Sequence, residues 1–193
     1  MQSAAPTMAT VRRPSGCSHL PPFPMTTHQL TIISGGQTGA DRAGLDWAIA
    51  NGIPHGGWCP QGRKAMDGPL DVQYNLQETP SRSYKQRTRW NVRDTDATVV
   101  FTVAPEATDG SLRTLQCAEE MAKPRLHLHP GLEAPHVLLA GFLVKHGVQR
   151  LNVAGSREEK EPGLYVWVRA VLVAFAEHHP AVTLYHGVSS SLR

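Results

Sequence analysis

The sequence predicts an α/β fold: a Rossmann-like three-layer αβα sandwich around a mainly parallel sheet of about five strands. Segments with strand composition alternate with helical segments along the chain. The strand candidates are continuous apolar runs, as in parallel sheets covered by helices on both faces. A glycine-rich turn also joins the first strand to the first helix, which is typical of ligand sites in open α/β sheets.

The predicted strands are short apolar segments with β-branched residues, and most run into glycine, proline or polar residues. They are Leu30–Ser34, Ile53–Pro60, Ala97–Val103, Arg125–His129 and Leu151–Ala154. Ala97–Val103 is the longest β-branched run and is expected to be a central strand.

The predicted helices lie between and after these strands. They are Ala40–Asn51, Ser81–Asp94, Ser111–Met121, Pro135–His146 and Pro162–His178. Gly52 and Gly147 stand where glycine commonly ends a helix, and Pro162 suits a first helical turn. Residues 61–80 carry several turn signals and are predicted to be ordered but irregular.

Residues 29–180 are predicted to form one ligand-binding domain, followed by a C-terminal strand or tail over 181–193. Residues 1–28 are rich in proline, serine and threonine and predict a disordered extension. A non-functional tail, or a misassigned start with translation beginning at Met25, is favoured over an organelle transit peptide. No apolar stretch suits a secretory signal or a membrane span.

The net charge of +3 comes from 19 basic and 16 acidic side chains. Arg12 and Arg13 supply two of these units, and residues 61–93 hold seven basic groups against three acidic ones. Because the excess is local and no reader motif is present, neither a nucleic-acid nor a membrane partner is expected. The three cysteines form no CxxC pair, which favours a reducing, cytoplasmic location.

The loop Ser34–Arg42 is the strongest candidate for an anion site. Gly35 and Gly36 permit a positive φ and close approach of a ligand, and Gly39 lets the helix start pack on the sheet. Backbone N–H groups at the start of that helix can hold an anion. The loop lacks the lysine of a P-loop and the first glycine of the dinucleotide fingerprint, so it supports neither an ATPase nor an NAD enzyme.

Four segments together resemble the molybdenum cofactor carrier family. They are Ile33–Asp46, Gly56–Arg63, Tyr84–Val92 and Leu151–Arg157, which occur in this order across residues 30–178. The family lies within a wider Rossmann-like nucleotide-ligand-binding group that includes lysine-decarboxylase-like phosphoribohydrolases. The resemblance implies a non-enzymatic carrier that holds molybdenum cofactor, or a related phosphorylated pterin or nucleotide, as a bound ligand. It also implies a homo-oligomer, with a molybdoenzyme as recipient of the cofactor.

A second phosphate cradle is predicted at Thr108–Thr114, where a helix follows the central strand; a simple serine N-cap is the alternative. Phosphoribohydrolases carry PGGxGTxxE at this place. This chain has neither the Pro-Gly-Gly nor the glutamate, which counts against hydrolase chemistry. No catalytic or metal-binding residue is predicted. The predicted ligand-binding residues are Gly35, Gly36, Gln37, Thr38, Gly39, Asp41, Arg42, Arg87, Asn91, Gly110, Ser111, Thr114, Asn152 and Gly155.

Two other functions stay open: a phosphoribohydrolase-like enzyme and a sensor of a nucleotide-derived ligand. The enzyme would need a carboxylate near the ribose, for which Asp41, Asp109 and Glu119 are candidates. In the carrier interpretation Asp41 caps the helix or orients Arg42 through an ion pair. Cys59 is expected to be a buried small hydrophobe.

Several basic and aromatic residues of 61–93 have two open interpretations: contacts to an anionic planar ligand, or a solvated helix face. They are Arg63, Arg82, Tyr84, Lys85, Arg87, Arg89 and Trp90. The helix Leu164–Phe175 has more apolar residues than one buried face needs, which predicts a subunit interface.

Overall fold

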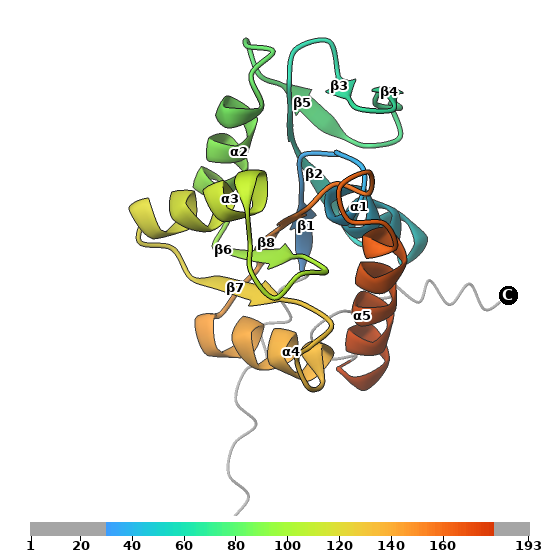
Figure 1. The fold of residues 1–193 in the computed structure, drawn as a ribbon, viewed down its shortest axis with the longest axis vertical. Coiled ribbons are helices and arrows are strands. Elements are labelled where there is room, and N and C mark those ends of the chain that lie inside the picture. The colour runs from blue at the N-terminus through green and yellow to red at the C-terminus, as the bar shows by residue number, and fades with distance from the viewer. Residues whose placement is uncertain (1–29, 180–193) are drawn as a thin grey trace, which may run out of the picture.

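A six-stranded parallel sheet forms the centre of the computed structural model, which describes residues 30–179 (Figure 1). The strand order is β5-β2-β1-β8-β6-β7. This architecture confirms the Rossmann-like prediction. The elements in chain order are β1 Thr31–Ile33, α1 Ala40–Ala50, β2 His55–Cys59, β3 Lys64–Ala65, β4 Gly68–Pro69, β5 Leu76–Glu78, α2 Tyr84–Arg93, β6 Ala97–Phe101, α3 Asp109–Glu120, β7 Arg125–Leu128, α4 Pro135–His146, β8 Arg150–Gly155 and α5 Leu164–His178.

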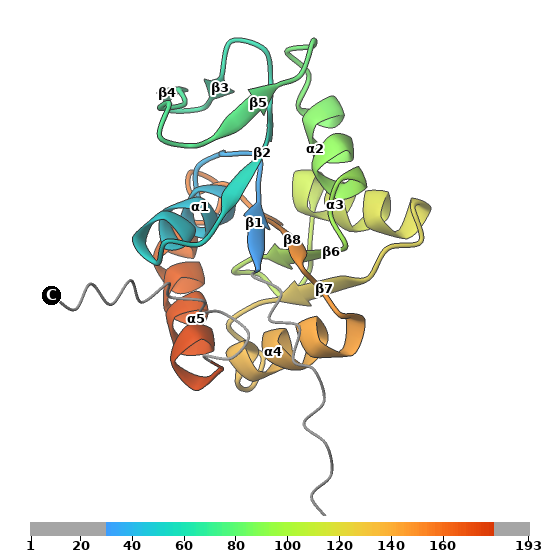
Figure 2. The same cartoon turned by 180° about the vertical axis from the view of Figure 1, so that it is seen from behind.

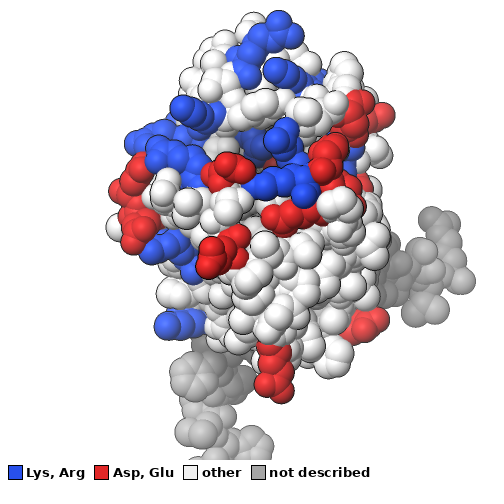
Figure 3. All heavy atoms as spheres, viewed as in Figure 1, with Lys and Arg blue, Asp and Glu red and all other residues white. Residues whose placement is uncertain are grey.

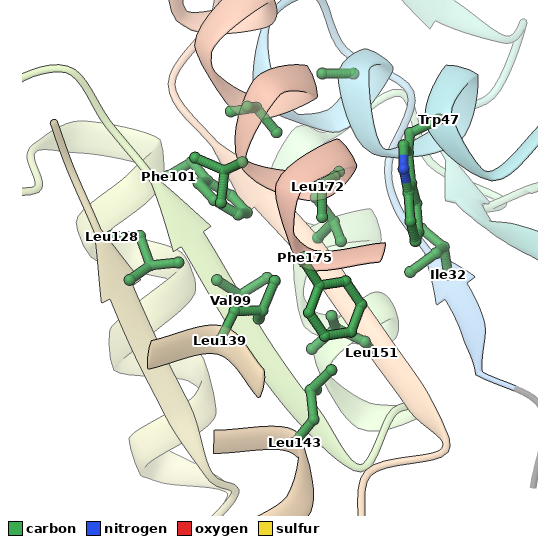
Figure 4. Close-up of a cluster of buried hydrophobic side chains, with 14 of the residues drawn as sticks. Ile32, Trp47, Val99, Phe101, Leu128, Leu139, Leu143, Leu151, Leu172 and Phe175 are labelled. Carbon is green, nitrogen blue, oxygen red and sulfur yellow. The ribbon is translucent and has the colours of Figure 1, made fainter. Parts of the chain in front are cut away.

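Helices α1, α4 and α5 cover one face of the sheet and enclose the larger core (Figure 4). Val99 and Phe101 of β6 point into it and meet Leu172 and Phe175 of α5. The Trp47 ring of α1 lies 6.3 Å from that of Phe175. All five residues of β6 are buried, because helices pack on both of its faces.

Helices α2 and α3 pack together on the opposite face (Figure 2). The apolar cluster here is small, consisting of Val92, Cys117 and Ala118 with Met121 at its edge. The strands also present polar side chains on this side. Asn152 Nδ2 of β8 donates to Thr98 Oγ1 of β6 over 3.2 Å, so the buried amide is satisfied within the sheet.

Residues 61–80 are more regular than predicted. They contain the β3–β4 hairpin and the edge strand β5, which pairs in parallel with β2. Because of β5, the sheet has six strands rather than about five. Leu76 is the one apolar residue of β5, so this strand has almost no hydrophobic signal in the sequence. The Arg63 guanidinium organises the segment by donating to the carbonyls of Leu70, Asp71, Tyr74 and Leu76.

Two helix starts differ from the prediction. α3 begins at Asp109, two residues early, and α5 begins at Leu164, so Pro162 precedes the helix instead of occupying its first turn. The predicted extension over 1–28 and the tail over 181–193 lie outside the described residues. Within residues 30–179, no helix combines the length and the apolar character needed to cross a membrane.

Candidate functional site

A pocket of about 270 Å³ lies at the carboxyl edge of the sheet. The segments after β1, β6 and β8 meet there, and α2 closes one side. The carboxyl edge of an open parallel sheet is where such folds bind ligands. The lining residues are Gln37, Asp41, Tyr84, Arg87, Thr88, Thr108, Asp109, Gly110, Ser111, Thr114, Ala154, Gly155, Ser156, Arg157 and Lys160.

A buried ion pair between Asp41 and Arg87 forms part of the pocket wall. Arg87 Nη1 donates to Asp41 Oδ2 over 2.8 Å. The Asp41 side chain is only 3% exposed and the Arg87 side chain 13%. Burial raises the pKa of Asp41, while the nearby positive charge of Arg87 opposes that rise. The prediction that Asp41 orients Arg42 is wrong, because Arg42 instead pairs with Asp67 at 3.1 Å.

Gly35 leaves room for the Arg87 guanidinium. A Cβ at this position would stand 1.8 Å from Arg87 Nη1, so any other residue displaces that side chain. Gly36 has φ 73° and packs against Leu70 and Leu76, and its carbonyl accepts from Arg42. The first two glycines of the loop therefore make close contacts with protein groups.

Gly39 and Gly155 hold the first helix close to β8. A Cβ on Gly39, which has φ 79°, would lie 2.5 Å from the Ser156 carbonyl. A Cβ on Gly155 would lie 2.7 Å from the Cβ of Ala40 in α1 and 2.1 Å from the carbonyl of Phe101 in β6. The prediction that Gly39 lets the helix start pack on the sheet is confirmed. The Thr38 hydroxyl donates to Glu159 over 2.7 Å.

The first turn of α3 forms the opposite side of the pocket. Ser111 Oγ lies 2.9 Å from Ser156 Oγ, which donates to Glu161 over 3.0 Å. Thr114 Oγ1 donates to the Gly110 carbonyl over 2.8 Å. Both hydroxyls therefore have protein partners, and the feature that suits an anion here is the partial positive charge of the α3 N-terminus.

Two cationic residues of the loop after β8 also line the pocket, and neither was among the predicted site residues. Lys160 Nζ lies 2.5 Å from Asp109 Oδ2 and 2.6 Å from Thr108 Oγ1. Arg157 is exposed and forms no ion pair within the described part of the chain. Their signal was available: parallel strands end at one edge, so the loop after Leu151–Ala154 should face the loop Ser34–Arg42.

The structure brings half of the predicted site residues together in the pocket lining: Gln37, Asp41, Arg87, Gly110, Ser111, Thr114 and Gly155. The others lie outside that lining: Gly35, Gly36, Thr38, Gly39, Arg42, Asn91 and Asn152. Asn91 links α2 to β2, since its side chain accepts from the Trp58 N–H over 2.7 Å and donates to the Trp58 carbonyl over 3.0 Å.

The basic stretch divides in the same way. Tyr84 and Arg87 line the pocket, whereas Arg82, Lys85 and Arg89 are exposed. Trp90 does not face the pocket but packs edge-on against Trp58, with ring centroids 4.6 Å apart. Both interpretations therefore apply: one face of α2 lines the pocket, and the other face is exposed to solvent.

Packing accounts for Cys59, and also for the two histidines of Arg125–His129, which alternate on the strand and were expected to be structural. Cys59 is fully buried in a small apolar cluster, and burial raises the pKa of its thiol. His127 and His129 share one side of the strand end, and His127 Nε2 lies 2.7 Å from Thr102 Oγ1. Across residues 30–179, no group of three or more His, Cys, Asp or Glu side chains could hold a metal ion.

Comparison with known proteins places this site in a family. Residues 32–176 match the model of the circularly permutated YpsA SLOG family. A crystal structure of a protein named putative molybdenum carrier protein, from Syntrophus aciditrophicus SB, superposes with a TM-score of 0.74. The two sequences are 41% identical over 77% of this chain and 95% of that one. No protein of curated function matches the chain.

These matches agree with the resemblance seen in the four sequence segments, and they include every residue that lines the pocket. The carrier name belongs to the neighbouring structure. The family model spans most of this sequence, from β1 to α5. The chain therefore belongs to the circularly permutated YpsA SLOG family.

Proposed function

We propose that the protein is a non-enzymatic carrier that binds molybdenum cofactor, or a related phosphorylated pterin or nucleotide, in the pocket at the carboxyl edge. The observation that carries the proposal is the positive charge gathered on one side of that pocket. There the α3 N-terminus at Asp109 and Gly110 lies with Arg157 and Lys160, all within one lining. The name of the similar crystal structure supports the same role.

The phosphate of the ligand is assigned to this α3 side and not to the loop Gly35–Gly39. The latter loop brings the carboxylate of Asp41 into the pocket, and Gly35, Gly36 and Gly39 contact protein groups. A second carboxylate, Asp109, is held by Lys160. A volume of about 270 Å³ is at the small end for ligand pockets, which fits a phosphate with one ring system and leaves the remainder of a larger cofactor outside.

The test uses two matched glycine substitutions. A Cβ at Gly110 or at Gly141 of α4 meets no atom within 4 Å, so aspartate is sterically accepted at both. Purified from cells that make molybdenum cofactor, the wild type and Gly141→Asp should carry pterin and molybdenum. Gly110→Asp places a negative charge at the α3 N-terminus and should lose both. Absence of pterin and molybdenum from all three, with no thermal stabilisation by added cofactor, would overturn the proposal.

We also propose that exposed basic residues of α2 form a docking surface for an acidic patch of a recipient molybdoenzyme. Lys and Arg side chains lie over the upper part of the molecule and over α2, with Asp and Glu side chains among them, while the surface over α4 and α5 is mostly uncharged (Figure 3). Lys85, Arg89 and Arg93 recur at helical spacing on the exposed side of α2, next to the pocket-lining residues Tyr84 and Thr88. Arg89 also pairs with Glu120 over 3.4 Å and Arg93 with Asp94 over 2.6 Å, both in exposed positions, so a partner's carboxylates would compete with these ion pairs. Residues 30–179 hold 16 basic and 16 acidic groups, so the basic surface is local and a long nucleic acid is not favoured.

A homo-oligomer is proposed from the outer surface of α5. Val166 and Val173 remain 68% and 41% exposed, and they lie on the same side of the helix as Ala170. α4 packs beside α5 and exposes Val144. Burial of this apolar surface against a second copy would remove it from water.

A further inference from the structure

The buried end of the pocket has unmet hydrogen-bonding capacity. Asp41 Oδ2 accepts from Arg87 Nη1 over 2.8 Å and from the Gln37 N–H over 3.4 Å. Asp41 Oδ1 accepts from no donor anywhere in residues 30–179, although 97% of the side chain is buried. Asp41 lines the pocket, and its Oδ1 is left without a protein donor on a side chain that is almost wholly buried, so a ligand donor is the natural partner.

Two further polar atoms nearby are unpartnered. In the described part of the chain, the Tyr84 hydroxyl and Arg87 Nε are buried without a hydrogen-bond partner. Both residues line the pocket. The Tyr84 ring lies between two cations, 5.3 Å from Lys64 Nζ and 6.0 Å from Arg87 Cζ, so its position is restricted by its neighbours.

The Asp41 carboxylate disfavours a phosphate next to its own oxygens, while the unpartnered Arg87 Nε–H and Tyr84 hydroxyl can donate to a neutral ring carbonyl. An ionised carboxylate only accepts hydrogen bonds, and so does an ionised phosphate, so neither satisfies the other and their charges repel. A ring N–H, by contrast, donates directly to a carboxylate oxygen. The pocket therefore has one side, at α3, that suits an anion and another, at Asp41, that suits a hydrogen-bond donor.

We propose that Asp41 accepts a hydrogen bond from a ring N–H of the bound ligand. The site then selects phosphorylated heterocycles in lactam form, such as pterins and guanine-type rings, over rings that carry no N–H. This inference rests on the proposed function, because it assumes that the phosphate occupies the α3 side. It adds the group that decides which ring is accepted.

Three purine nucleotides with the same phosphate and ribose test the selection. Purine riboside 5′-monophosphate has no ring donor, inosine monophosphate has one N–H, and guanosine monophosphate adds an amino group. Calorimetric titration of the full-length protein should show that inosine monophosphate binds about tenfold more tightly than purine riboside monophosphate, or better. Equal affinities for all three overturn the donor subsite but leave phosphate binding intact. No binding of any of them, or of inorganic phosphate, overturns the proposed phosphate site as well.

Asp41→Asn provides the matching variant. Because Arg87 requires an acceptor, the new amide oxygen should face Arg87 and the amide nitrogen should face the ligand. The preference for inosine over purine riboside monophosphate should then disappear or reverse. Asp67→Asn is the control, because it removes a carboxylate charge outside the pocket, and it should keep the preference.

Tyr84→Phe keeps the proposal testable if Asp41→Asn does not fold. This change removes a hydroxyl that has no partner in the described structure, so the thermal midpoint should stay the same or rise. Because the hydroxyl can then no longer donate to the ring carbonyl beside the N–H, affinity for guanosine monophosphate should fall severalfold. Unchanged affinity and selectivity in whichever of these variants fold would overturn the proposal.

Discussion

The Arg87 guanidinium lies 2.8 Å from the buried carboxylate of Asp41, and these two residues come from α2 and α1, on opposite faces of the sheet. Their contact crosses the edge of the sheet where the pocket opens. The pair thus connects the two helical layers and sets the charge of the pocket wall.

Gly35→Ala is expected to disrupt this pair. The new Cβ would lie 1.8 Å from Arg87 Nη1, so the guanidinium has to move away from Asp41. Leaving a buried charge without its partner costs about 3 kcal/mol, and urea unfolding should show a loss of that order. Gly141→Ala is the control: its Cβ has open space on an exposed part of α4, and alanine should stabilise that helix by up to about 1 kcal/mol. Equal midpoints for Gly35→Ala and the wild type would contradict the observed packing.

Arg87→Met should make stability strongly dependent on pH. Burial already raises the folded-state pKa of Asp41 above the ordinary value of 3.8, and removal of the opposing Arg87 charge raises it further. A raised carboxyl pKa favours the folded state below pH 3.8, and that contribution is lost as the pH rises through the folded-state pKa. The difference in unfolding free energy from the wild type should therefore be small in acid and grow toward neutral pH. A difference independent of pH would show that Asp41 is not the group left unpaired.

Asp46 is expected to control the ionisation of Tyr74. Asp46 accepts hydrogen bonds from Tyr74 over 2.8 Å and from Tyr165 over 2.7 Å, which ties residues 61–80 and α5 to α1. Burial, followed by the Asp46 contact, raises the pKa of Tyr74 to about 12. In Asp46→Asn, ultraviolet titration should show the pKa of Tyr74 moving back toward the ordinary value of 10.0, and the pKa of Tyr165, which burial and then the Asp46 contact also raise, moving in the same direction. Asp71→Asn, which removes an exposed carboxylate, should leave the titration unchanged.

Asn91→Ala should reduce stability without changing which ligand binds. The amide satisfies both the N–H and the carbonyl of Trp58, and its loss leaves these two backbone groups without partners. A cost of roughly 2 kcal/mol is expected in thermal or urea unfolding. Ligand affinity, measured below the unfolding range, should match the wild type, because Asn91 lies outside the pocket lining. A stable variant with weakened binding would instead make Asn91 a ligand contact.

Val166→Asp tests the proposed subunit interface. This residue is 68% exposed, so the charge should be accepted by a monomer but not by an apolar contact between two copies. Light scattering should give an oligomer for the wild type and a smaller mass for the variant. Val72→Asp, at a residue that is 84% exposed on the segment between β4 and β5, is the control and should keep the wild-type mass. A wild-type monomer would remove this proposal.

Local patterns in the sequence predicted most of the elements but not all of their contacts. Ala97–Val103 was recognisable because a strand buried on both faces is apolar throughout. β5 was missed because Leu76 is its one apolar residue and its pairing with β2 depends on how residues 61–80 fold back. The partner of Asp41 was assigned wrongly because Arg42 is adjacent in sequence, whereas Arg87 approaches only when α2 packs beside the loop after β1.

The sequence by itself determined the fold class, the family and the edge of the sheet where a ligand would bind. These features follow from hydrophobic periodicity, glycine placement and strand-to-helix order, which are local properties of the chain. Only the tertiary structure decided that Asp41 pairs with Arg87, that Arg157 and Lys160 join the pocket, and that Asn91 serves packing. Each of these depends on side chains from distant elements meeting in space, and their burial and charge are defined only after the layers have packed.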